Sequence, residues 1–256
     1  MKIFGNEVSW VILFGGKNRQ GAIKTLLENN LNIKKVLVPN DRKELIIAVK
    51  EVVGARDVEI HEVAKDEIAS VISGTGVKYL LSIGFPFKIH NEIIDRMELC
   101  LNLHPTLLPM YRGPNSGAYV IKNSESIAGS TVHILTSEID SGPIIMQSKV
   151  KLTKFDTTKS MQRKVYQSEP ELLLASLKLL ENGFTPQEQD LSLGSEYPVR
   201  RPDDSEIDPT KSLIELFDDI RSSDPINYPA FFYINNQKVC ISMWRPVKTE
   251  EDIDGI

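Results

Sequence analysis

The sequence contains little cysteine and no long apolar run. Only Cys100 and Cys240 occur in 256 residues, far apart and outside any CxxC pair. This excludes a disulfide framework and a zinc knuckle, and we expect both thiols to be reduced and buried. No stretch approaches the roughly 18 to 20 consecutive apolar residues that a membrane span requires, and the N-terminus lacks a small-residue cleavage site. These absences predict a cytoplasmic protein with no membrane partner.

The sequence also lacks an excess of basic residues. Thirty Lys and Arg stand against 35 Asp and Glu, which gives a formal net charge of −5. A broad basic face that binds phosphates is therefore not expected, and we predict no nucleic-acid partner. The remaining composition, 41% hydrophobic and 25% charged, is typical of a folded globular protein.

Short β-branched runs alternate with segments of helical periodicity over the first 150 residues. This pattern predicts the α/β class, a Rossmann-like, mostly parallel sheet with flanking helices. Expected strands are 8–14, 34–39, 59–63, 79–83, 100–103, 128–134 and 144–151; expected helices are 20–29, 45–53, 66–73, 93–97, 116–122 and 160–181. Pro170 predicts a kink or break in the last helix.

Composition shifts toward Pro, Asp, Ser and Gly after residue 185. We therefore predict a catalytic domain over 1–188 and a small α+β extension over 189–256. The extension is expected to hold a helix at 212–220 and a hairpin at 231–244 that turns at Asn235-Asn236.

The strongest candidate site is the run NLHPTLLPMYRG, which begins at Asn102. Strand alternation places Asn102 and His104 on one side, about 7 Å apart. Asp140 follows 38 residues later in a loop between two expected strands. An amide that holds an oxyanion, an imidazole that moves a proton and a carboxylate that orients it are what acyl transfer requires. The alternative is that Asn102 and His104 only cap the end of a strand.

The two motifs NLHPTLLPMYRG and EIDSGPII closely resemble the signature of formyltransferases that use N10-formyltetrahydrofolate. These enzymes act on glycinamide ribonucleotide, methionyl-tRNA or amino sugars, and the resemblance covers most of residues 8–183. It implies the formyltransferase fold, N10-formyltetrahydrofolate as formyl donor, no metal, and a catalytic triad of Asn102, His104 and Asp140. Thr106 stands where the family usually has Ser, and it retains the hydroxyl.

The resemblance also implies binding residues for folate. It places the folate pocket at two segments, formed by Phe87, Lys88 and Ile89 and by Ser137, Glu138 and Ile139. The alternative for the aromatic rings of Phe85 and Phe87 is a place in the core.

A Gly-rich turn at 15–21 opens the first helix, where N–H groups favour an anion. By resemblance to glycinamide ribonucleotide formyltransferase, Gly16, Lys17 and Asn18 could meet an acceptor phosphate, and we add Arg112 to the expected substrate-binding residues. A tight turn without a ligand is the alternative. His61, His90 and His133 lack metal-ligand spacing, and we expect surface or packing roles for them.

The acceptor is predicted by comparing the branches of this family. Methionyl-tRNA formyltransferases are longer and have a basic C-terminal domain, whereas residues 197–248 here hold seven Lys and Arg against eight Asp and Glu. Glycinamide ribonucleotide formyltransferases usually stop near the helix that ends at residue 181. The sequence therefore resembles the sugar N-formyltransferases most, which implies a nucleotide-linked amino-deoxysugar, such as a 4-amino-4,6-dideoxy hexose for a surface polysaccharide.

Three alternatives remain open at this stage. They are formyl transfer to another amine such as methionyl-tRNA, hydrolysis of formyltetrahydrofolate or binding of folate without transfer, and, more remotely, an NAD-dependent dehydrogenase. The hairpin aromatics Phe231, Phe232 and Trp244 could form a homodimer surface or pack onto their own chain.

Overall fold

The computed structural model describes residues 1–114, 116–248 and 255–256. A seven-stranded sheet has the strand order β3-β2-β1-β4-β5-β6-β7. Strands β1 to β5 are parallel, and β6 pairs antiparallel with both β5 and β7. The strands are β1 (Trp10–Phe14), β2 (Ile33–Pro39), β3 (Glu59–Val63), β4 (Tyr79–Ile83), β5 (Leu99–His104), β6 (Ile127–Ile134) and β7 (Ile144–Lys151). The predicted α/β class with a mostly parallel sheet is confirmed.

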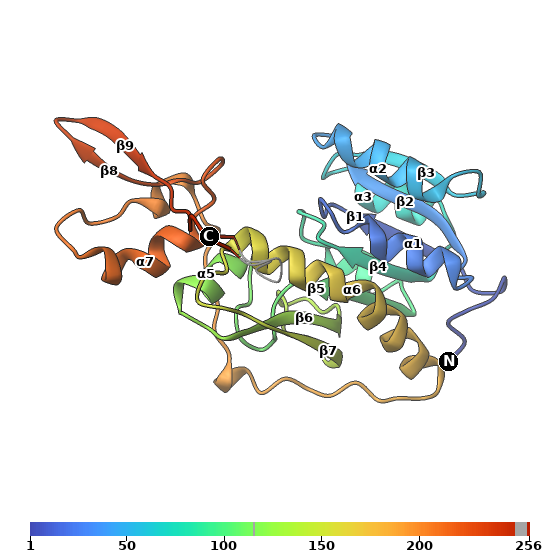
Figure 1. Cartoon of the computed structure of the whole chain (residues 1–256). Coiled ribbons are helices and arrows are strands. Elements are labelled where there is room, and N and C mark those ends of the chain that lie inside the picture. Colours follow the sequence, from blue (N-terminus) through green and yellow to red (C-terminus); the bar gives the residue numbers. More distant parts are fainter. Residues whose placement is uncertain (115, 249–254) are drawn as a thin grey trace.

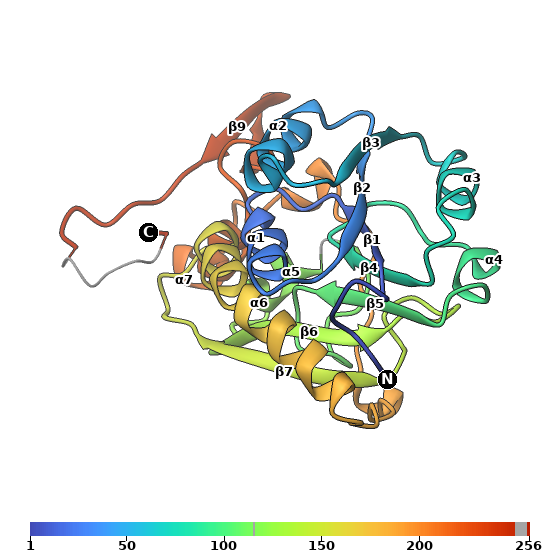
Figure 2. The same cartoon turned by 90° about the vertical axis from the view of Figure 1, so that its right-hand side faces the viewer.

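Helices cover both faces of this sheet (Figures 1 and 2). They are α1 (Gln20–Glu28), α2 (Lys43–Val53), α3 (Ile68–Ser73), α4 (Asn91–Ile94), α5 (Gly117–Lys122) and α6 (Thr158–Glu181). Trp10, Ile12 and Phe14 of β1 pack with α1, α2 and α6, whereas Val11 and Leu13 pack with α3 and α4. The continuous apolar run of β1 thus follows from burial on both faces, as in other parallel sheets.

Helix α6 runs unbroken through Pro170, so the predicted break is wrong. Buried residues on both sides of the proline, among them Val165 and Leu173, pack the helix against the rest of the protein. This packing outweighs the helical hydrogen bond that proline cannot donate. At the start, the Thr157 hydroxyl accepts from the Ser160 N–H, and the Ser160 side chain accepts from the Thr157 N–H.

The C-terminal segment forms a small unit at one end of the sheet (Figure 1). It holds two 3-10 turns (Leu191–Leu193 and Pro202–Ser205), helix α7 (Leu213–Ser222) and the hairpin β8 (Ala230–Ile234) and β9 (Gln237–Ile241). Asn235 and Asn236 have φ values of 48° and 61°, as a tight two-residue hairpin turn requires, so the predicted turn is confirmed. The domain division after residue 188 stays a prediction.

The two cysteines differ in their surroundings. Cys100 lies in the core, and burial raises its pKa to about 12. Cys240 lies exposed on β9, so the prediction that it is buried is wrong. The reason is that the hairpin packs only one face against α7, where Ile220 and Ala230 are buried. Within the described residues, no helix is long and apolar enough to cross a membrane.

Candidate active site

Strand β5 carries the first two candidate catalytic residues at its carboxyl end. Leu101 and Leu103 pack in the core on the side of the sheet that α1 and α6 cover. Asn102 and His104 alternate with them and therefore face the opposite side, as strand alternation predicts. Ligands of open α/β sheets bind at this end of the strands. The antiparallel pairing with β6 places His133 opposite Asn102 and Thr131 opposite His104.

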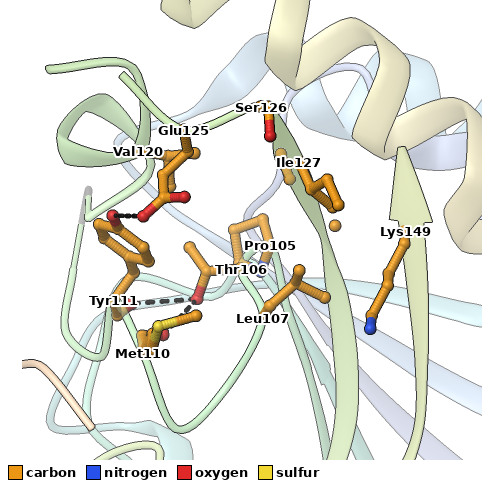
Figure 3. Close-up of a pocket in the computed structure, with 12 residues that line it drawn as sticks. Pro105, Thr106, Leu107, Met110, Tyr111, Val120, Glu125, Ser126, Ile127 and Lys149 are labelled. Carbon is orange, nitrogen blue, oxygen red and sulfur yellow. Dashed lines mark hydrogen bonds between the residues drawn. The ribbon is translucent and has the colours of Figure 1, made fainter. Parts of the chain in front are cut away.

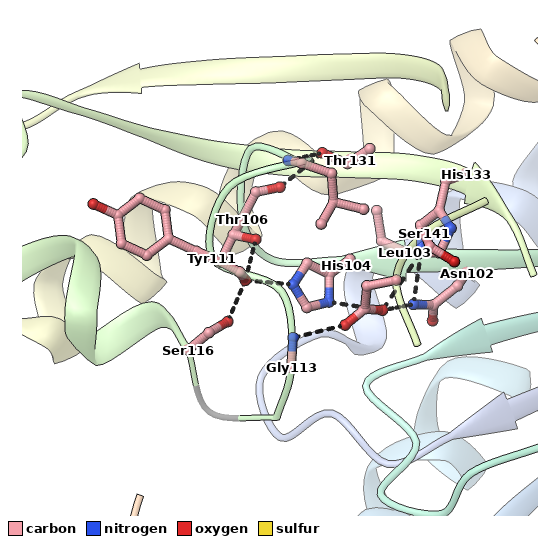
Figure 4. A network of polar contacts seen from close by, with 12 residues as sticks. Asn102, Leu103, His104, Thr106, Tyr111, Gly113, Ser116, Thr131, His133 and Ser141 are labelled. Carbon is pink, nitrogen blue, oxygen red and sulfur yellow. Dashed lines mark hydrogen bonds and ion pairs between the residues drawn. The ribbon is translucent and has the colours of Figure 1, made fainter. Parts of the chain in front are cut away.

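Asn102, His104 and the Gly113 N–H point toward one another (Figure 4), and Asp140 contacts all three. Its Oδ1 accepts a hydrogen bond from Asn102 Nδ2 at 3.3 Å and lies 3.4 Å from His104 Nδ1. Its Oδ2 accepts from the Gly113 N–H at 3.0 Å. Asp140 itself has a φ of 53°, a left-handed conformation that Asp tolerates better than most residues. The three side chains that the sequence separates by up to 38 positions therefore form one polar cluster.

The second ring nitrogen of His104 faces a backbone carbonyl. His104 Nε2 lies 3.2 Å from the Tyr111 oxygen, which also accepts from the hydroxyls of Thr106 at 3.0 Å and Ser116 at 2.6 Å. Thr106 thus uses the hydroxyl that it shares with Ser to hold this carbonyl in place. Both imidazole nitrogens of His104 lie beside oxygen atoms, Nδ1 beside Asp140 Oδ1 and Nε2 beside the Tyr111 carbonyl. When the ring is protonated, it can donate a hydrogen bond to each of them.

Burial sets the resting charges of the cluster. His104 is only 8% exposed, and burial lowers its pKa, although the nearby Asp140 carboxylate opposes that change. Burial by itself raises the pKa of Asp140, but the neighbouring imidazoles and the Gly113 N–H outweigh it and hold that pKa below its usual range. At neutral pH the site thus pairs an ionised carboxylate with a neutral imidazole that is ready to accept a proton.

The lowered pKa of His104 predicts how stability changes with pH. Below the ordinary histidine pKa of about 6.5, the unfolded chain binds a proton that folded His104 does not bind, so the free energy of unfolding falls as pH falls. We expect wild type to lose more thermal stability between about pH 7.5 and 5.5 than His104→Gln loses. The exposed His61→Gln variant is the matched control and should follow wild type. Equal losses in wild type and His104→Gln would contradict this prediction.

His133 is buried beside this cluster, so of the two predicted roles a surface role is wrong and a packing role agrees with the structure. Its Nε2 lies 3.1 Å from Asn102 Nδ2 and 3.7 Å from Asp140 Oδ1, and its Nδ1 lies 2.9 Å from the Ile134 oxygen. The ring is 1% exposed. The sequence held no spacing signal for this contact, because it arises from the antiparallel register of β5 and β6.

The residues predicted to bind folate lie in two segments beside β5. In the first, Phe87 is half-buried, Lys88 is exposed, and Ile89 is buried in the core below α4. In the second, all three residues are exposed: Ser137, Glu138 and Ile139. Phe87 and Leu135, which precedes the second segment, both pack against the core cluster on the α3 and α4 side of the sheet. Their role in binding stays a prediction.

The residues predicted to bind substrate lie in two different turns. Gly16, Lys17 and Asn18 follow β1, where Lys17 and Asn18 are exposed and Asn18 has a φ of 65°. Arg112 lies in the other turn, between the Tyr111 carbonyl and the Gly113 N–H that contact His104 and Asp140. Its Nε is buried and has no hydrogen-bond partner among the residues that the structure describes. Their contacts with a substrate stay a prediction.

The segment after α6 supports both loops of the site. Gln189 Nε2 donates to the Asp140 carbonyl at 3.0 Å and to the Gly142 carbonyl at 2.7 Å. The Ser195 side chain accepts from the Tyr111 N–H at 2.9 Å, and its carbonyl accepts from the Arg112 N–H at 2.9 Å. Residues 189–195, which the sequence suggested only as a domain boundary, thus hold the Asp140 loop and the Tyr111 turn in place.

We expect Gln189→Ala to lower kcat about tenfold, because its two hydrogen bonds of about 1 kcal/mol each, to the Asp140 and Gly142 carbonyls, fix the Asp140 loop. The KM values should change much less, since Gln189 holds the loop from outside the catalytic cluster. Gln187→Ala is the matched control, because Gln187 pairs with Ile144 through its backbone and has an exposed side chain. A wild-type kcat in Gln189→Ala would show that the loop holds its position without this side chain.

Two cavities lie near the site without including Asn102, His104 or Asp140. The smaller, of about 250 Å³, lies between the Thr106–Tyr111 turn and β6 (Figure 3). At its edge the Tyr111 hydroxyl donates to Glu125 at 2.7 Å. The larger, of about 760 Å³, extends from Asn18 along α6 to the C-terminal segment. In the part of the chain that the structure describes, no group of three His, Cys, Asp or Glu side chains could hold a metal ion.

Comparison with known proteins gives concordant matches. Residues 10–177 match a family model described as formyl transferase. Methionyl-tRNA formyltransferase of Thermotoga maritima is 27% identical over 218 residues, which cover 79% of this chain and 68% of that protein. A 4-N formyltransferase from Francisella tularensis has a TM-score of 0.79 at 21% identity, and the match covers 93% of this chain and 98% of that chain. A sugar N-formyltransferase from a Shewanella species has a TM-score of 0.73 at 18% identity, covering 95% and 100%.

Proposed function

The chain belongs to the formyl transferase family, and from this premise we propose that it transfers a formyl group from N10-formyltetrahydrofolate to an amine of a nucleotide-linked amino-deoxysugar. The polar cluster of Asn102, His104 and Asp140 is the observation that carries the proposal. A 4-amino-4,6-dideoxy hexose is the acceptor that we favour, with its product used in a surface polysaccharide. We place the reaction in the cytoplasm.

The segments beside β5 fit a folate. A pterin is a flat ring that needs apolar contact and hydrogen-bonding groups at its edge. Half-buried Phe87 and half-exposed Ile139 offer apolar surface, and the exposed backbone of 137–139 offers donors and acceptors. These residues would hold the folate, which when bound supplies a formyl carbon attached to a nitrogen leaving group.

The cluster provides each proton-handling step that formyl transfer needs. As an acceptor amine attacks the formyl carbon, the Asn102 amide stabilises the negative charge that develops on the formyl oxygen, and His104 adds its positive charge once it has taken up a proton. Neutral His104 takes up the proton that the amine loses, and Asp140 stabilises the resulting imidazolium at Nδ1. His104 then returns this proton to the folate nitrogen, so one proton moves from amine to folate and none is lost.

The choice of a sugar acceptor rests on charge and on architecture. Residues 197–248 have no basic excess with which to grip tRNA. The match to the Shewanella sugar N-formyltransferase covers that whole chain, and the match to the Francisella 4-N formyltransferase covers nearly all of it. Transfer to methionyl-tRNA is the second candidate, because the T. maritima relative carries that name.

The test is to incubate the protein with N10-formyltetrahydrofolate and a panel of nucleotide-linked amino sugars. We expect tetrahydrofolate release together with a mass gain of one CO unit on one sugar, and loss of both in His104→Ala. Formylation of methionyl-tRNA alone would establish the second candidate. Folate turnover with release of formate and no formylated acceptor would establish hydrolysis.

We also propose a homodimer formed through the C-terminal hairpin. Phe231 is buried within its own chain, and Phe232 packs against the small core that includes Leu216 and Ile220. Trp244, in contrast, is 79% exposed, and Ile234 is 54% exposed. Sedimentation equilibrium of wild type and Trp244→Ser tests this proposal. A monomeric wild type would refute it.

A further inference from the structure

The Asn102 side chain has a second polar neighbour besides Asp140. His133 Nε2 lies 3.1 Å from Asn102 Nδ2, and the two side chains meet beside β5 (Figure 4). The antiparallel register places the two residues directly opposite each other on β5 and β6. Side chains at opposite positions of an antiparallel pair lie on the same face and contact each other, so this contact follows from the strand pairing.

A bulge in the next strand lies at the same position. The pairing between β6 and β7 shifts register between Val132 and His133, which leaves Ile145 of β7 between their two partners. An extra residue of this kind increases the local twist of the strand pair, and bulges beside active sites direct a side chain. The irregularity therefore falls at the residue that contacts Asn102, and not elsewhere along the register of these two strands.

The surroundings of the His133 ring decide which nitrogen carries its hydrogen. His133 Nδ1 lies 2.9 Å from the Ile134 carbonyl oxygen, which can only accept a hydrogen bond. In its neutral form the ring has one N–H and one lone pair, so Nδ1 carries the hydrogen and Nε2 presents the lone pair. Asn102 Nδ2 therefore donates to His133 Nε2. The ring is 1% exposed, so bulk water does not compete for this hydrogen bond.

Two acceptors share the amide nitrogen of Asn102. Nδ2 lies 3.1 Å from His133 Nε2 and 3.3 Å from Asp140 Oδ1, and those two acceptors are 3.7 Å apart. Seen from Nδ2, this nearly equilateral triangle places the acceptors closer together in angle than the two N–H bonds of a planar amide. They cannot both receive a straight hydrogen bond, and the shorter contact is the one with His133. The second N–H is thus not aligned with Asp140 and is available to a substrate oxygen.

We propose that His133 is a positioning residue for formyl transfer, which accepts one amide N–H of Asn102 and thereby fixes the orientation in which the other N–H faces the formyl oxygen. The identity of that oxygen rests on the proposed function. Without His133, the amide is free to turn and donate a straight hydrogen bond to Asp140, which is a strong acceptor because it is charged. The N–H that stabilises the developing negative charge would then lose its direction.

The first test compares His133→Leu with His133→Gln by the rate of tetrahydrofolate release. Leucine fills the buried site without an acceptor, and we expect kcat to fall at least about tenfold while the KM values change less than about threefold, because the amide acts on the transition state. Glutamine presents a carbonyl oxygen that can accept from Asn102, and it should recover most of the loss. Val132→Ala removes a core side chain from the other face of β6, and as the matched control for packing damage it should keep the wild-type kcat.

A double variant identifies the partner through which His133 acts. In the Asn102→Ala background, adding His133→Leu should lower kcat no further, since the amide that His133 orients is already absent. Multiplicative losses in the double variant would overturn the inference, because His133 would then act apart from Asn102. Equal kcat in His133→Leu and wild type, or equal losses in His133→Leu and His133→Gln, would also overturn it.

A spectroscopic test needs no acceptor and separates this inference from the proposed function. Long-range proton–nitrogen NMR correlations of histidine-labelled protein report which ring nitrogen carries the hydrogen, and the signal that disappears in His133→Gln is that of His133. We expect the hydrogen on Nδ1 and a shift of the Nε2 resonance in Asn102→Ala. A hydrogen on Nε2, or an Nε2 resonance that does not move, would overturn the inference even if an amino sugar is formylated. A wild type that formylates no amino sugar but shows both NMR results would refute the proposed acceptor and support the hydrogen bond between His133 and Asn102.

Discussion

Asp140→Asn is expected to lower turnover by about 10²- to 10⁴-fold while the protein stays folded. The carboxylate accepts from the Gly113 N–H and the Asn102 amide and faces His104 Nδ1. An amide in its place turns one acceptor into a donor and removes the charge that stabilises a protonated His104. Initial rates of tetrahydrofolate release measure the effect, and a circular-dichroism melt verifies folding.

The exposed Asp57→Asn variant is the matched control and should retain wild-type turnover. His104→Ala should lose activity to a similar extent. The double variant should turn over about as fast as the less active of the two single variants, because the effects of residues that act as a unit do not add. Multiplicative losses would show that Asp140 and His104 act separately. Turnover of Asp140→Asn within a few-fold of wild type would remove Asp140 from the mechanism.

Arg19→Ala is expected to lower the free energy of unfolding by about 3 to 5 kcal/mol. Arg19 Nη2 and Nε donate to the Glu169 carboxylate at 2.6 and 2.7 Å, and both side chains are only 1% exposed. Glu169 also accepts from the Ser130 hydroxyl at 2.7 Å. Removing the guanidinium leaves a buried carboxylate without its cation and removes one donor from the Leu103 carbonyl. Urea unfolding followed by circular dichroism measures the loss.

Two further variants distinguish charge loss from general damage. The exposed Arg56→Ala should change the free energy of unfolding by less than about 0.5 kcal/mol. Arg19→Met/Glu169→Leu removes both charges together and should be more stable than Arg19→Ala, because no unpaired charge remains buried. A double variant that is less stable than Arg19→Ala would show that packing at this site matters more than charge balance.

The sequence by itself predicted the order of the elements and the candidate residues Asn102, His104 and Asp140. A continuous apolar run such as that of β1 indicates a strand of a parallel sheet without any knowledge of contacts. Helices cover both faces of such a sheet, so side chains on both faces of the strand are apolar. The adjacency of Asn102 and His104 follows from the two-residue period of a strand. Asn235-Asn236 is likewise a local signal, because few other residues adopt two left-handed conformations in succession.

Only the tertiary structure decided which distant residues join this site. His133 reaches Asn102 through the antiparallel register of β5 and β6, and Gln189 reaches the Asp140 carbonyl from a segment 49 residues later. Neither contact leaves a periodic or spacing signal, since each depends on how separate elements pack. The same holds for Pro170, where packing of α6 overrides the local preference for a break, and for Cys240, whose exposure depends on which hairpin face meets α7. Contacts between residues a few positions apart follow from the local sequence, because strand and turn geometry fix them. Burial and contacts between distant residues depend on how the elements pack against one another.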